Sequence, residues 1–570
     1  MRKFPTSSEK KSKSKKSQSS SHIRVVVAID FGTTNSGFAS AHKESPEKGE
    51  IYTAWPGNKP DHKTPTALQY DSKYKKVTAW GIKALVEFQE DAESSDDDDS
   101  QLSRPVELFK LHLSDLKDED KPWLPPELDY KQAIKDYLTG MRKLVEERLS
   151  SRWSSVKFPS QVKIVLTIPA EWPPDTTEIM RKCAHEAGLL NKLSSNNLEF
   201  TTEPEAAALY CLSVVKEHNL KPGDCGGGTV DITIRKLLEN NGLGEITERI
   251  GYPCGSTFVD KEFLKFVGEK VGMHALSKFK KNHYKQIQYL VQEFFCRKIK
   301  IHFNGKQSEW KIKKLNLLNY CKNLQGYVTG DRKTEMENAG WIIKIDFTSV
   351  KEMFDPVVNK ILELISDQLK ASKEKCSAMF LVGGFAESVY LLNKVKETFR
   401  FQVEDICVPT SPKTAVVQGG LYYGLNINTV KTRVLKWSFG IEAANEWVSG
   451  NDEERRSPKG LIYTFECLAK RGSQVDVNKP FSKIFHPARA DQKAVAFKIF
   501  YTASVDGKYC DDPGMNYIKT LHINLKNVQF FGRDRPIEFK LTFGQLESKA
   551  SAYNNITGKL IKEIYFDRKD

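Results

Sequence analysis

Short runs of β-branched and apolar residues, with few polar interruptions, recur along most of the chain. Residues 23–29 read Ile-Arg-Val-Val-Val-Ala-Ile, and residues 162–168 read Val-Lys-Ile-Val-Leu-Thr-Ile. Runs of this kind are typical of strands buried on both faces of a sheet. We predict further strands at residues 37–41, 198–201, 230–236 and 378–382.

Between these runs, apolar residues recur with the spacing of a helix. This spacing predicts helices at residues 131–149, 176–187, 205–215, 388–399 and 414–425. Strands that alternate with helices indicate an α/β fold.

The pattern changes after about residue 429. Apolar and polar residues alternate in short segments at residues 494–501, 520–525 and 537–543, separated by Gly, Asn, Asp and Pro. This alternation is typical of antiparallel strands with one buried face. We therefore predict a β-rich C-terminal module and a domain boundary near residues 426–435.

Composition narrows the class of protein. The chain has 570 residues and a formal charge of +14, part of which lies in the Lys/Ser-rich residues 1–21. That segment has too few apolar residues to fold, and the remaining positive charge is dispersed, so we expect no nucleic-acid partner. No apolar run is long enough to cross a membrane. The ten cysteines form no CxxC pair, which favours reduced thiols and a cytoplasmic protein, with the nucleus as the alternative.

A first Gly-Thr loop follows the strand at residues 23–29. It contains Asp30, Gly32, Thr33 and Thr34, and a second strand leaves it. Glycine lets the backbone turn tightly and approach a ligand, and the amides of such a turn can surround phosphate oxygens. Asp30, at the end of the strand, is placed to hold Mg²⁺ through water.

Three further elements carry candidate chemistry. A second Gly-Thr loop repeats the logic of the first, an acid precedes a Pro-initiated Ala-rich helix, and a strand runs into a Gly-Gly turn. Their residues are Asp224, Gly226, Gly227, Gly228, Thr229 and Asp231 in the loop, Glu203 before the helix, and Gly383, Gly384 and Phe385 in the turn. No GxxxxGK[ST] loop and no GxGxxG at a helix start occur, which excludes P-loop and Rossmann sites.

In these elements and their order the chain resembles the ATPase domain of the 70-kDa heat-shock proteins, in particular the divergent family 12 branch and its fungal relatives. The resemblance covers about residues 23–426. It implies an α/β fold of the actin-like kind, with two lobes built from duplicated ribonuclease-H-like domains. The implied divisions are a disordered basic tail at 1–22, lobe I at 23–212 with an acidic loop at 91–100, lobe II at 213–405, a helix returning to lobe I at 406–426, and a degenerate substrate-binding-like β module at 427–570.

The resemblance also implies a site for ATP or ADP and Mg²⁺, with possible protein clients on the C-terminal module. Metal ligation falls on Asp30 and Asp224. Nucleotide contacts fall on Gly32, Thr33, Thr34, Gly226, Gly227, Gly228, Thr229, Gly383, Gly384 and Phe385. Catalytic roles fall on Glu203, Asp231 and Thr229, and on Lys110 as the candidate for a lysine from the edge of lobe I; a surface lysine is the other interpretation of Lys110.

One departure concerns the second loop. In this family an apolar strand precedes it, but here residues 216–225 are polar and contain Pro222. A skipped coding segment, a degenerate ATPase and a real structural compensation are three explanations that the sequence leaves open. An ATPase chaperone and a non-catalytic nucleotide-dependent binding module therefore both stand as hypotheses. A metabolite kinase and an actin-like filament are weaker alternatives, because no sugar-binding cluster and no filament feature is evident.

Overall fold

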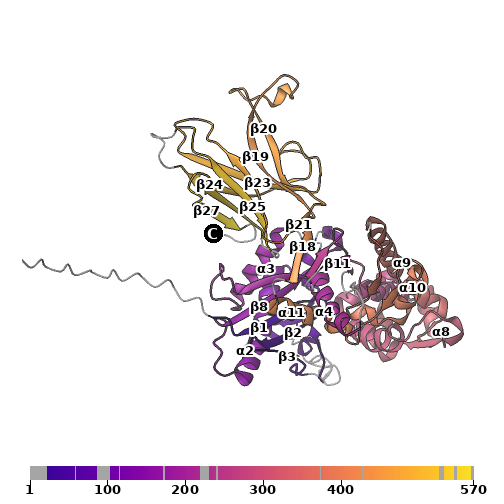
Figure 1. Cartoon of the computed structure of the whole chain (residues 1–570). Helices are drawn as coiled ribbons and strands as arrows, with labels where there is room; N and C mark the ends of the chain where they lie inside the picture. Colours follow the sequence, from indigo (N-terminus) through magenta and orange to yellow (C-terminus); the bar gives the residue numbers. More distant parts are fainter. Residues whose placement is uncertain are drawn as a thin grey trace, which may run out of the picture.

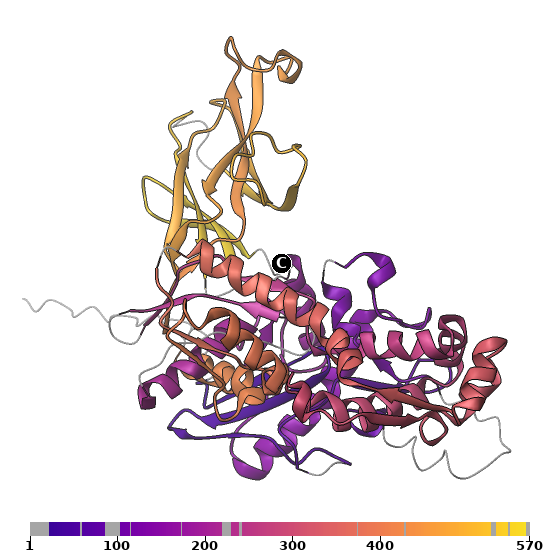
Figure 2. The same cartoon turned by 90° about the vertical axis from the view of Figure 1, so that its right-hand side faces the viewer.

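The computed structural model describes residues 22–57, 60–85, 103–114, 116–170, 172, 174–218, 230–238, 242–372, 374–426, 429–525, 532–544 and 548–565. Within these residues the chain forms a mixed α/β body and a C-terminal region of strands. In both views the C-terminal strands stand on one side of the α/β body (Figures 1 and 2). The tail at 1–21 and the acidic loop predicted at 91–100 lie outside the described residues.

The first sheet has the strand order β3-β2-β1-β8-β9. Its strands are β1 (Val25–Asp30), β2 (Asn35–His42), β3 (Ser45–Ile51), β8 (Val162–Ile168) and β9 (Leu198–Thr202). Strand β1 lies in the centre, antiparallel to β2 and parallel to β8.

Helices cover both faces of this sheet, which explains the unbroken apolar runs. Val25, Val27 and Ile29 face the core formed with α2 (Tyr130–Arg152) and α3 (Pro174–Glu186). The alternate residues Val26 and Ala28 face α4 (Glu203–His218) and α11 (Ala415–Leu425). The helix predicted to return to lobe I is thus packed on the first sheet. A small sheet of β5 (Ala67–Tyr70), β6 (Val77–Trp80) and β7 (Val106–Glu107) lies beside it, and β4 (Thr64–Pro65) pairs with β2.

The second part of the α/β body has its own hydrophobic core. Its described helices are α5 (Ser256–Val271), α6 (Met273–Asn282), α7 (Tyr284–Tyr289), the π-helix at Leu290–Lys300, α8 (Asp331–Asn338), α9 (Phe347–Ala371) and α10 (Val389–Phe399). Its described strands are β10 (Val230–Ile232), β11 (Arg235–Leu238), β12 (Gly242–Glu245), β13 (Ile250–Tyr252), β14 (Lys313–Asn316), β15 (Ile342–Ile345), β16 (Ala378–Phe380) and β17 (Asp405–Cys407).

The prediction of one strand at 230–236 is wrong, because this segment forms two strands. β10 pairs with β13, whereas β11 pairs with β12, and Thr233 and Ile234 lie between them. The strand is interrupted where its partner changes from β13 to β12. No other described strand pairs with the edges of β10 and β11 that face away from these partners.

The C-terminal strands surround a third hydrophobic core. One sheet has the order β20-β19-β23-β24 and the other β22-β25-β26-β27. Their bounds are β19 (Ser438–Glu446), β20 (Leu461–Ala469), β22 (Pro480–Phe485), β23 (Ala494–Thr502), β24 (Met515–Asn524), β25 (Ile537–Phe543), β26 (Ser548–Asn554) and β27 (Leu560–Tyr565). The alternating segments at residues 494–501, 520–525 and 537–543 lie in β23, at the end of β24 and in β25.

Two strands join this region to the α/β body. β18 (Val430–Val434) pairs in parallel with β12 and antiparallel with β21 (Gln474–Asp476). A sheet of order β11-β12-β18-β21 therefore continues from the α/β body into the C-terminal region (Figure 1). Of the helices in the described ranges, none is both long and apolar enough to span a bilayer.

Candidate functional site

The turn after β1 requires glycine at its second residue. A Cβ atom on Gly32 would lie 2.1 Å from the main-chain oxygen of Asn35. The hydroxyl of Thr66 donates a hydrogen bond of 2.8 Å to the Gly32 carbonyl and holds the turn from the neighbouring segment. The tight turn predicted for the first Gly-Thr loop is present, with Thr33 buried and Thr34 partly exposed.

Asp30 lies at the end of β1 and is almost completely buried. Its carboxylate accepts hydrogen bonds from the Lys63 ammonium at 2.6 Å and the Thr167 hydroxyl at 3.3 Å. Lys63 was not among the residues predicted from the sequence. Its only local signal is its position before the β4 residues Thr64 and Pro65, which bring it beside β2.

Lys110 is a buried residue and not a surface lysine. It lies in the 3-10 helix Phe109–Leu113 and is 2% exposed. Its ammonium donates a hydrogen bond of 2.6 Å to Glu203 Oε1, and it lies 5.2 Å from the ring centre of Trp172. A buried lysine is stable as a cation only beside an opposite charge, which Glu203 supplies from the start of α4.

Asp231 completes a group of charged side chains around this ion pair. It is 3% exposed, and its Oδ1 accepts a hydrogen bond of 3.1 Å from the Ala170 amide. The pKa of Glu203 is raised to about 7, chiefly by burial. Lys110 opposes this rise, while the negative charges of Asp231 and Asp30 add to it. Four residues from distant segments therefore share one electrostatic environment.

The Gly-Gly turn follows β16. Gly383 has φ of 85°, a conformation that favours glycine, and its amide donates to the Pro412 carbonyl at 2.8 Å. A Cβ on Gly384 would meet no atom within 4 Å, so the backbone there borders open space. The Phe385 ring is 2% exposed and belongs to the second core, which leaves only its main chain for contact with a ligand.

Comparison with known proteins gives relatives over nearly the whole chain. Heat shock 70 kDa protein 12A of Homo sapiens is 24% identical over 621 aligned residues, which cover 94% of this chain and 90% of that protein. Heat shock 70 kDa protein 12B of Homo sapiens is 24% identical with the same coverage of both chains. Over nearly its whole length the chain is thus similar to the divergent family 12 branch of the 70-kDa heat-shock proteins.

The chain is also similar to 70-kDa heat-shock proteins outside the family 12 branch. Chaperone protein HscA of Buchnera aphidicola is 23% identical over 393 residues, or 66% of each chain. No protein-family model matches the sequence. The family predicted from the Gly-rich loops is thus confirmed by relatives that extend beyond residues 23–426 into the C-terminal strands.

Several predicted site residues of this heat-shock 70 relative lie outside the described residues. They are Asp224, Gly226, Gly227, Gly228 and Thr229, and their roles stay predictions. Of the predicted catalytic residues, the structure brings together Lys110, Glu203 and Asp231, beside the predicted metal ligand Asp30.

The residues around Lys110 fit a magnesium ion of the kind that binds with a nucleotide. In the described part of the chain no group of three or more His, Cys, Asp or Glu side chains could enclose a metal by itself. Mg²⁺ usually takes one or two carboxylates and completes its shell with water and substrate phosphates. Asp30 and Asp231, both buried and close enough to raise the pKa of Glu203, could serve as such carboxylates.

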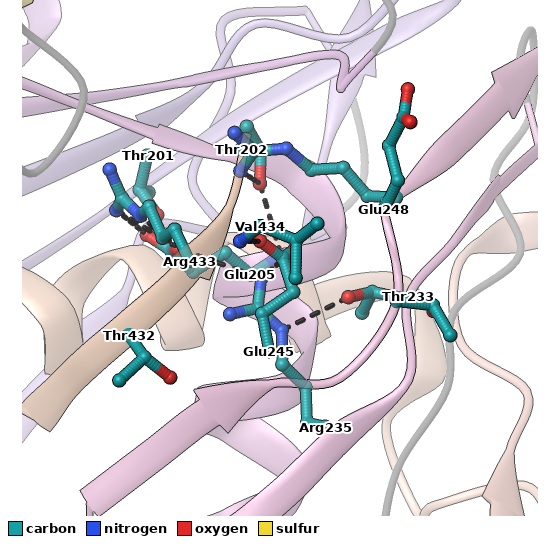
Figure 3. A network of polar contacts seen from close by, with 12 residues as sticks. Thr201, Thr202, Glu205, Thr233, Arg235, Glu245, Glu248, Thr432, Arg433 and Val434 are labelled. Carbon is teal, nitrogen blue, oxygen red and sulfur yellow. Dashed lines mark hydrogen bonds and ion pairs between the residues drawn. The ribbon is translucent and has the colours of Figure 1, made fainter. Parts of the chain in front are cut away.

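A second buried polar cluster, which the sequence did not predict, lies where the C-terminal region joins the α/β body (Figure 3). Glu205, fully buried, accepts hydrogen bonds from Arg433 Nη2 at 2.7 Å and from the Thr201 hydroxyl at 3.0 Å. Arg235 lies 3.1 Å from Glu245, whose other oxygen accepts from the Val434 amide at 2.8 Å. Burial acts to raise the pKa of Glu205, but Arg433 and Arg235 together hold it below its usual value.

Proposed function

We propose that this chain binds Mg²⁺-ATP between two actin-like lobes and uses the bound nucleotide to control a protein client on its C-terminal strands. One observation carries the proposal: Lys110, Glu203, Asp30 and Asp231 converge beside the Gly32 turn. Charged groups that are buried together in this way, next to a turn that can approach a ligand, suit a phosphate and its metal ion.

The two parts of the α/β body support the duplicated-lobe fold. In the first sheet β2 and β3 lie on one side of β1, and β8 and β9 on the other. In the second part β11 and β12 correspond to β2 and β3 as an antiparallel pair, and β16 and β17 to β8 and β9 as a parallel pair. Asp30 ends β1 and Glu203 directly follows β9, whereas Asp231 lies within β10 of the second part and accepts a hydrogen bond from the Ala170 amide of the first.

The residues have distinct roles in the proposed reaction. The amides of the turn at residues 32–34 would hold phosphate oxygens, and Lys110 would stabilise the charge that develops on the transferred phosphoryl group. Glu203, with its pKa near 7, is suited to accept a proton from the attacking water at neutral pH. A bound Mg²⁺, held through Asp30 and Asp231, would supply additional positive charge to the phosphates.

A non-catalytic nucleotide-binding module is the second candidate. The observation that favours it is that no described strand pairs with one edge of β10 and β11, and the sequence lacks the apolar strand expected before Cys225. A poorly supported loop can still hold a nucleotide but position water less accurately, and misplacement by about 1 Å can reduce a rate about 10²-fold.

The test compares Lys110→Met with a matched control. Lys163 also forms an ion pair within the first α/β part, with Glu199 at 3.2 Å, but lies away from the site. We expect Lys110→Met to reduce ATP turnover about 10²-fold, as the loss of one charge-stabilising donor usually does, and Lys163→Met to leave it unchanged. Fluorescent-nucleotide titration with Mg²⁺ measures binding, and phosphate release measures turnover.

Three results separate the candidates. Turnover that falls in Lys110→Met while ATP still binds supports the ATPase. Binding without measurable turnover in the unmodified chain supports the non-catalytic module. Equal effects of Lys110→Met and Lys163→Met on turnover, in a chain that hydrolyses ATP, would rule out this site.

A further inference from the structure

The second α/β part contains a cavity between two strand edges. It is partly open to solvent and is lined by residues 232–236 on one side and 374–381 on the other. Ile365, Gln368 and Leu369 of α9 also line it. Because successive side chains of a strand point to opposite faces, a strand face would contribute only alternate residues to a lining. Consecutive residues on both sides indicate that the cavity is bordered by two edges, one from the end of β10 to the start of β11 and one formed by β16 and the residues before it.

Main-chain hydrogen bonds confirm which groups of β16 point into the cavity. On the side of β17, the Ser377 carbonyl accepts from the Asp405 amide at 3.1 Å, and the Leu381 amide donates to the Cys407 carbonyl at 2.9 Å. Since alternate residues of a parallel strand bond to opposite neighbours, the N–H and C=O groups of Ala378 and Phe380 point away from β17. The Ala378 carbonyl accepts from the Cys376 thiol at 3.3 Å, which is a weak donor.

The opposite edge is open in the same way. The Ile234 carbonyl accepts from the Ile246 amide at 3.0 Å, so Ile234 bonds toward the β12 side. The main-chain groups of Arg235 then point to the other side, into the cavity. Across the described ranges, no strand pairs with this edge of β11 or with the free edge of β16.

The first α/β part shows what fits between two such edges. There, β1 lies between β2, to which it is antiparallel, and β8, to which it is parallel. The cavity occupies the equivalent position between β11 and β16. Strand β1 has six residues, Val-Val-Val-Ala-Ile-Asp, all buried. An occupant of the cavity would likewise be covered on both faces, and therefore needs apolar side chains at nearly every position.

We infer that the space between β11 and β16 is a strand-acceptor slot, which binds an extended apolar segment of about six residues from another polypeptide. The segment would run parallel to β16 and antiparallel to β11, and would make main-chain hydrogen bonds with Ala378, Phe380 and Arg235. Strand addition of this kind obtains affinity from the main chain and selectivity from alternate side chains.

One end of the slot is defined by an ion pair. Lys236 Nζ lies 2.7 Å from Glu374 Oε1, which links β11 to the segment just before β16. With the inferred direction, the N-terminal end of the bound segment lies beside this pair, and the C-terminal end lies beside Ile232 and Leu381. This inference does not depend on nucleotide binding, since none of the charged residues around Lys110 lines the slot.

The test uses a fluorescein-labelled peptide with the sequence of β1, flanked by lysines for solubility, and the full chain. We expect saturable binding by fluorescence anisotropy, and at least tenfold weaker binding when proline replaces the third valine, because proline cannot donate a ladder hydrogen bond. Equal binding of both peptides, or no binding to folded chain, would overturn the inference.

Two protein variants sharpen the test. Ala378→Pro removes one slot-facing N–H while it leaves the bonds to β17 in place, and should weaken peptide binding at least tenfold; circular dichroism verifies its fold. Insertion of Val-Val-Val-Ala-Ile-Asp between Asp224 and Cys225 supplies a strand within the chain, and should abolish peptide binding and raise the melting temperature. If the chain sediments as a dimer that the peptide dissociates, the occupant is a second copy of this chain, and the assignment to a different protein is wrong.

Discussion

The charged side chains beside the Gly32 turn are stable only as a group. Lys110 is 2% exposed and Asp30 is 3% exposed, and an isolated charge at either position would carry a large desolvation cost. Each has a partner at 2.6 Å, Glu203 for Lys110 and Lys63 for Asp30. Buried ion pairs of this kind contribute little net stability. Their presence beside the turn therefore favours a functional role over a purely structural one.

The raised pKa of Glu203 gives the proposed reaction a pH dependence. Burial, Asp231 and Asp30 disfavour the ionised form, so Glu203 is mostly protonated at pH 6 and mostly ionised at pH 8. A base must be ionised to accept a proton, and kcat/KM for ATP hydrolysis should therefore rise with pH, with a midpoint near 7.

The control for this prediction is Glu199, which shortly precedes Glu203 in the sequence but does not belong to the site. Glu203→Gln should lower kcat/KM and remove the pH dependence, whereas Glu199→Gln should keep both, because Glu199 pairs with Lys163 away from the site. A profile that stays flat from pH 6 to 8 in the unmodified chain would contradict the assignment of Glu203 as the base.

At the scale of elements, β18 is held by charges as well as by main-chain hydrogen bonds. It lies between β12 and β21, and its Arg433 reaches Glu205 on α4 with two nitrogens, while a third bonds the Gly544 carbonyl. Figure 3 shows Arg433 beside Glu205 of α4, and the bond to Gly544 adds a contact with the C-terminal strands. Arg471, from the C-terminal region, forms a more exposed pair with Glu248 at 3.1 Å.

The two arginines differ in how much stability their removal should cost. Arg433→Met leaves Glu205 buried without its main partner, and should destabilise the protein by about 3–5 kcal/mol. Arg471→Met breaks a pair whose arginine side chain is 37% exposed, and should cost about 0–1 kcal/mol. Calorimetric melting of both variants measures the difference. Equal melting temperatures would show that the buried cluster does not hold β18.

At the scale of the whole molecule, the C-terminal region is joined to the α/β body through a continuous sheet. The sheet β11-β12-β18-β21 contains strands of both, so the C-terminal region cannot move freely while this sheet is intact (Figures 1 and 2). Any signal from the proposed nucleotide site to a client would have to pass through, or release, these strands.

A proline in β18 should separate the two regions. Thr432 is paired with Gly244 on one side and Asp476 on the other, and proline in a central strand removes a ladder hydrogen bond. We expect Thr432→Pro to increase the radius of gyration in small-angle X-ray scattering and to expose the junction to trypsin. Thr432→Ser, which keeps the amide, should behave like the unmodified chain. An unchanged scattering profile for Thr432→Pro would mean that other contacts hold the regions together.

The sequence by itself determined the features that depend on local pattern. The buried strands β8 and β25, the helices α2 and α11, the Gly32 turn and the alternating C-terminal strands follow from burial and backbone sterics, which each segment's own residues express. The order of the Gly-rich loops indicated the family. The sequence also indicated a missing strand before Cys225, and the open edges of β11 and β16 lie where such a strand would pair.

Only the tertiary structure decided which charges meet. Lys110 and Glu203 are 93 residues apart, Asp30 and Lys63 are 33 apart, and Glu205 and Arg433 are 228 apart. No local pattern encodes such pairs, because a buried ion pair depends on where distant segments pack and not on the residues beside it. For the same reason Lys110 could be taken from the sequence as a surface residue, and residues 426–435 as a domain boundary, until the fold placed Lys110 beside Glu203 and β18 between β12 and β21.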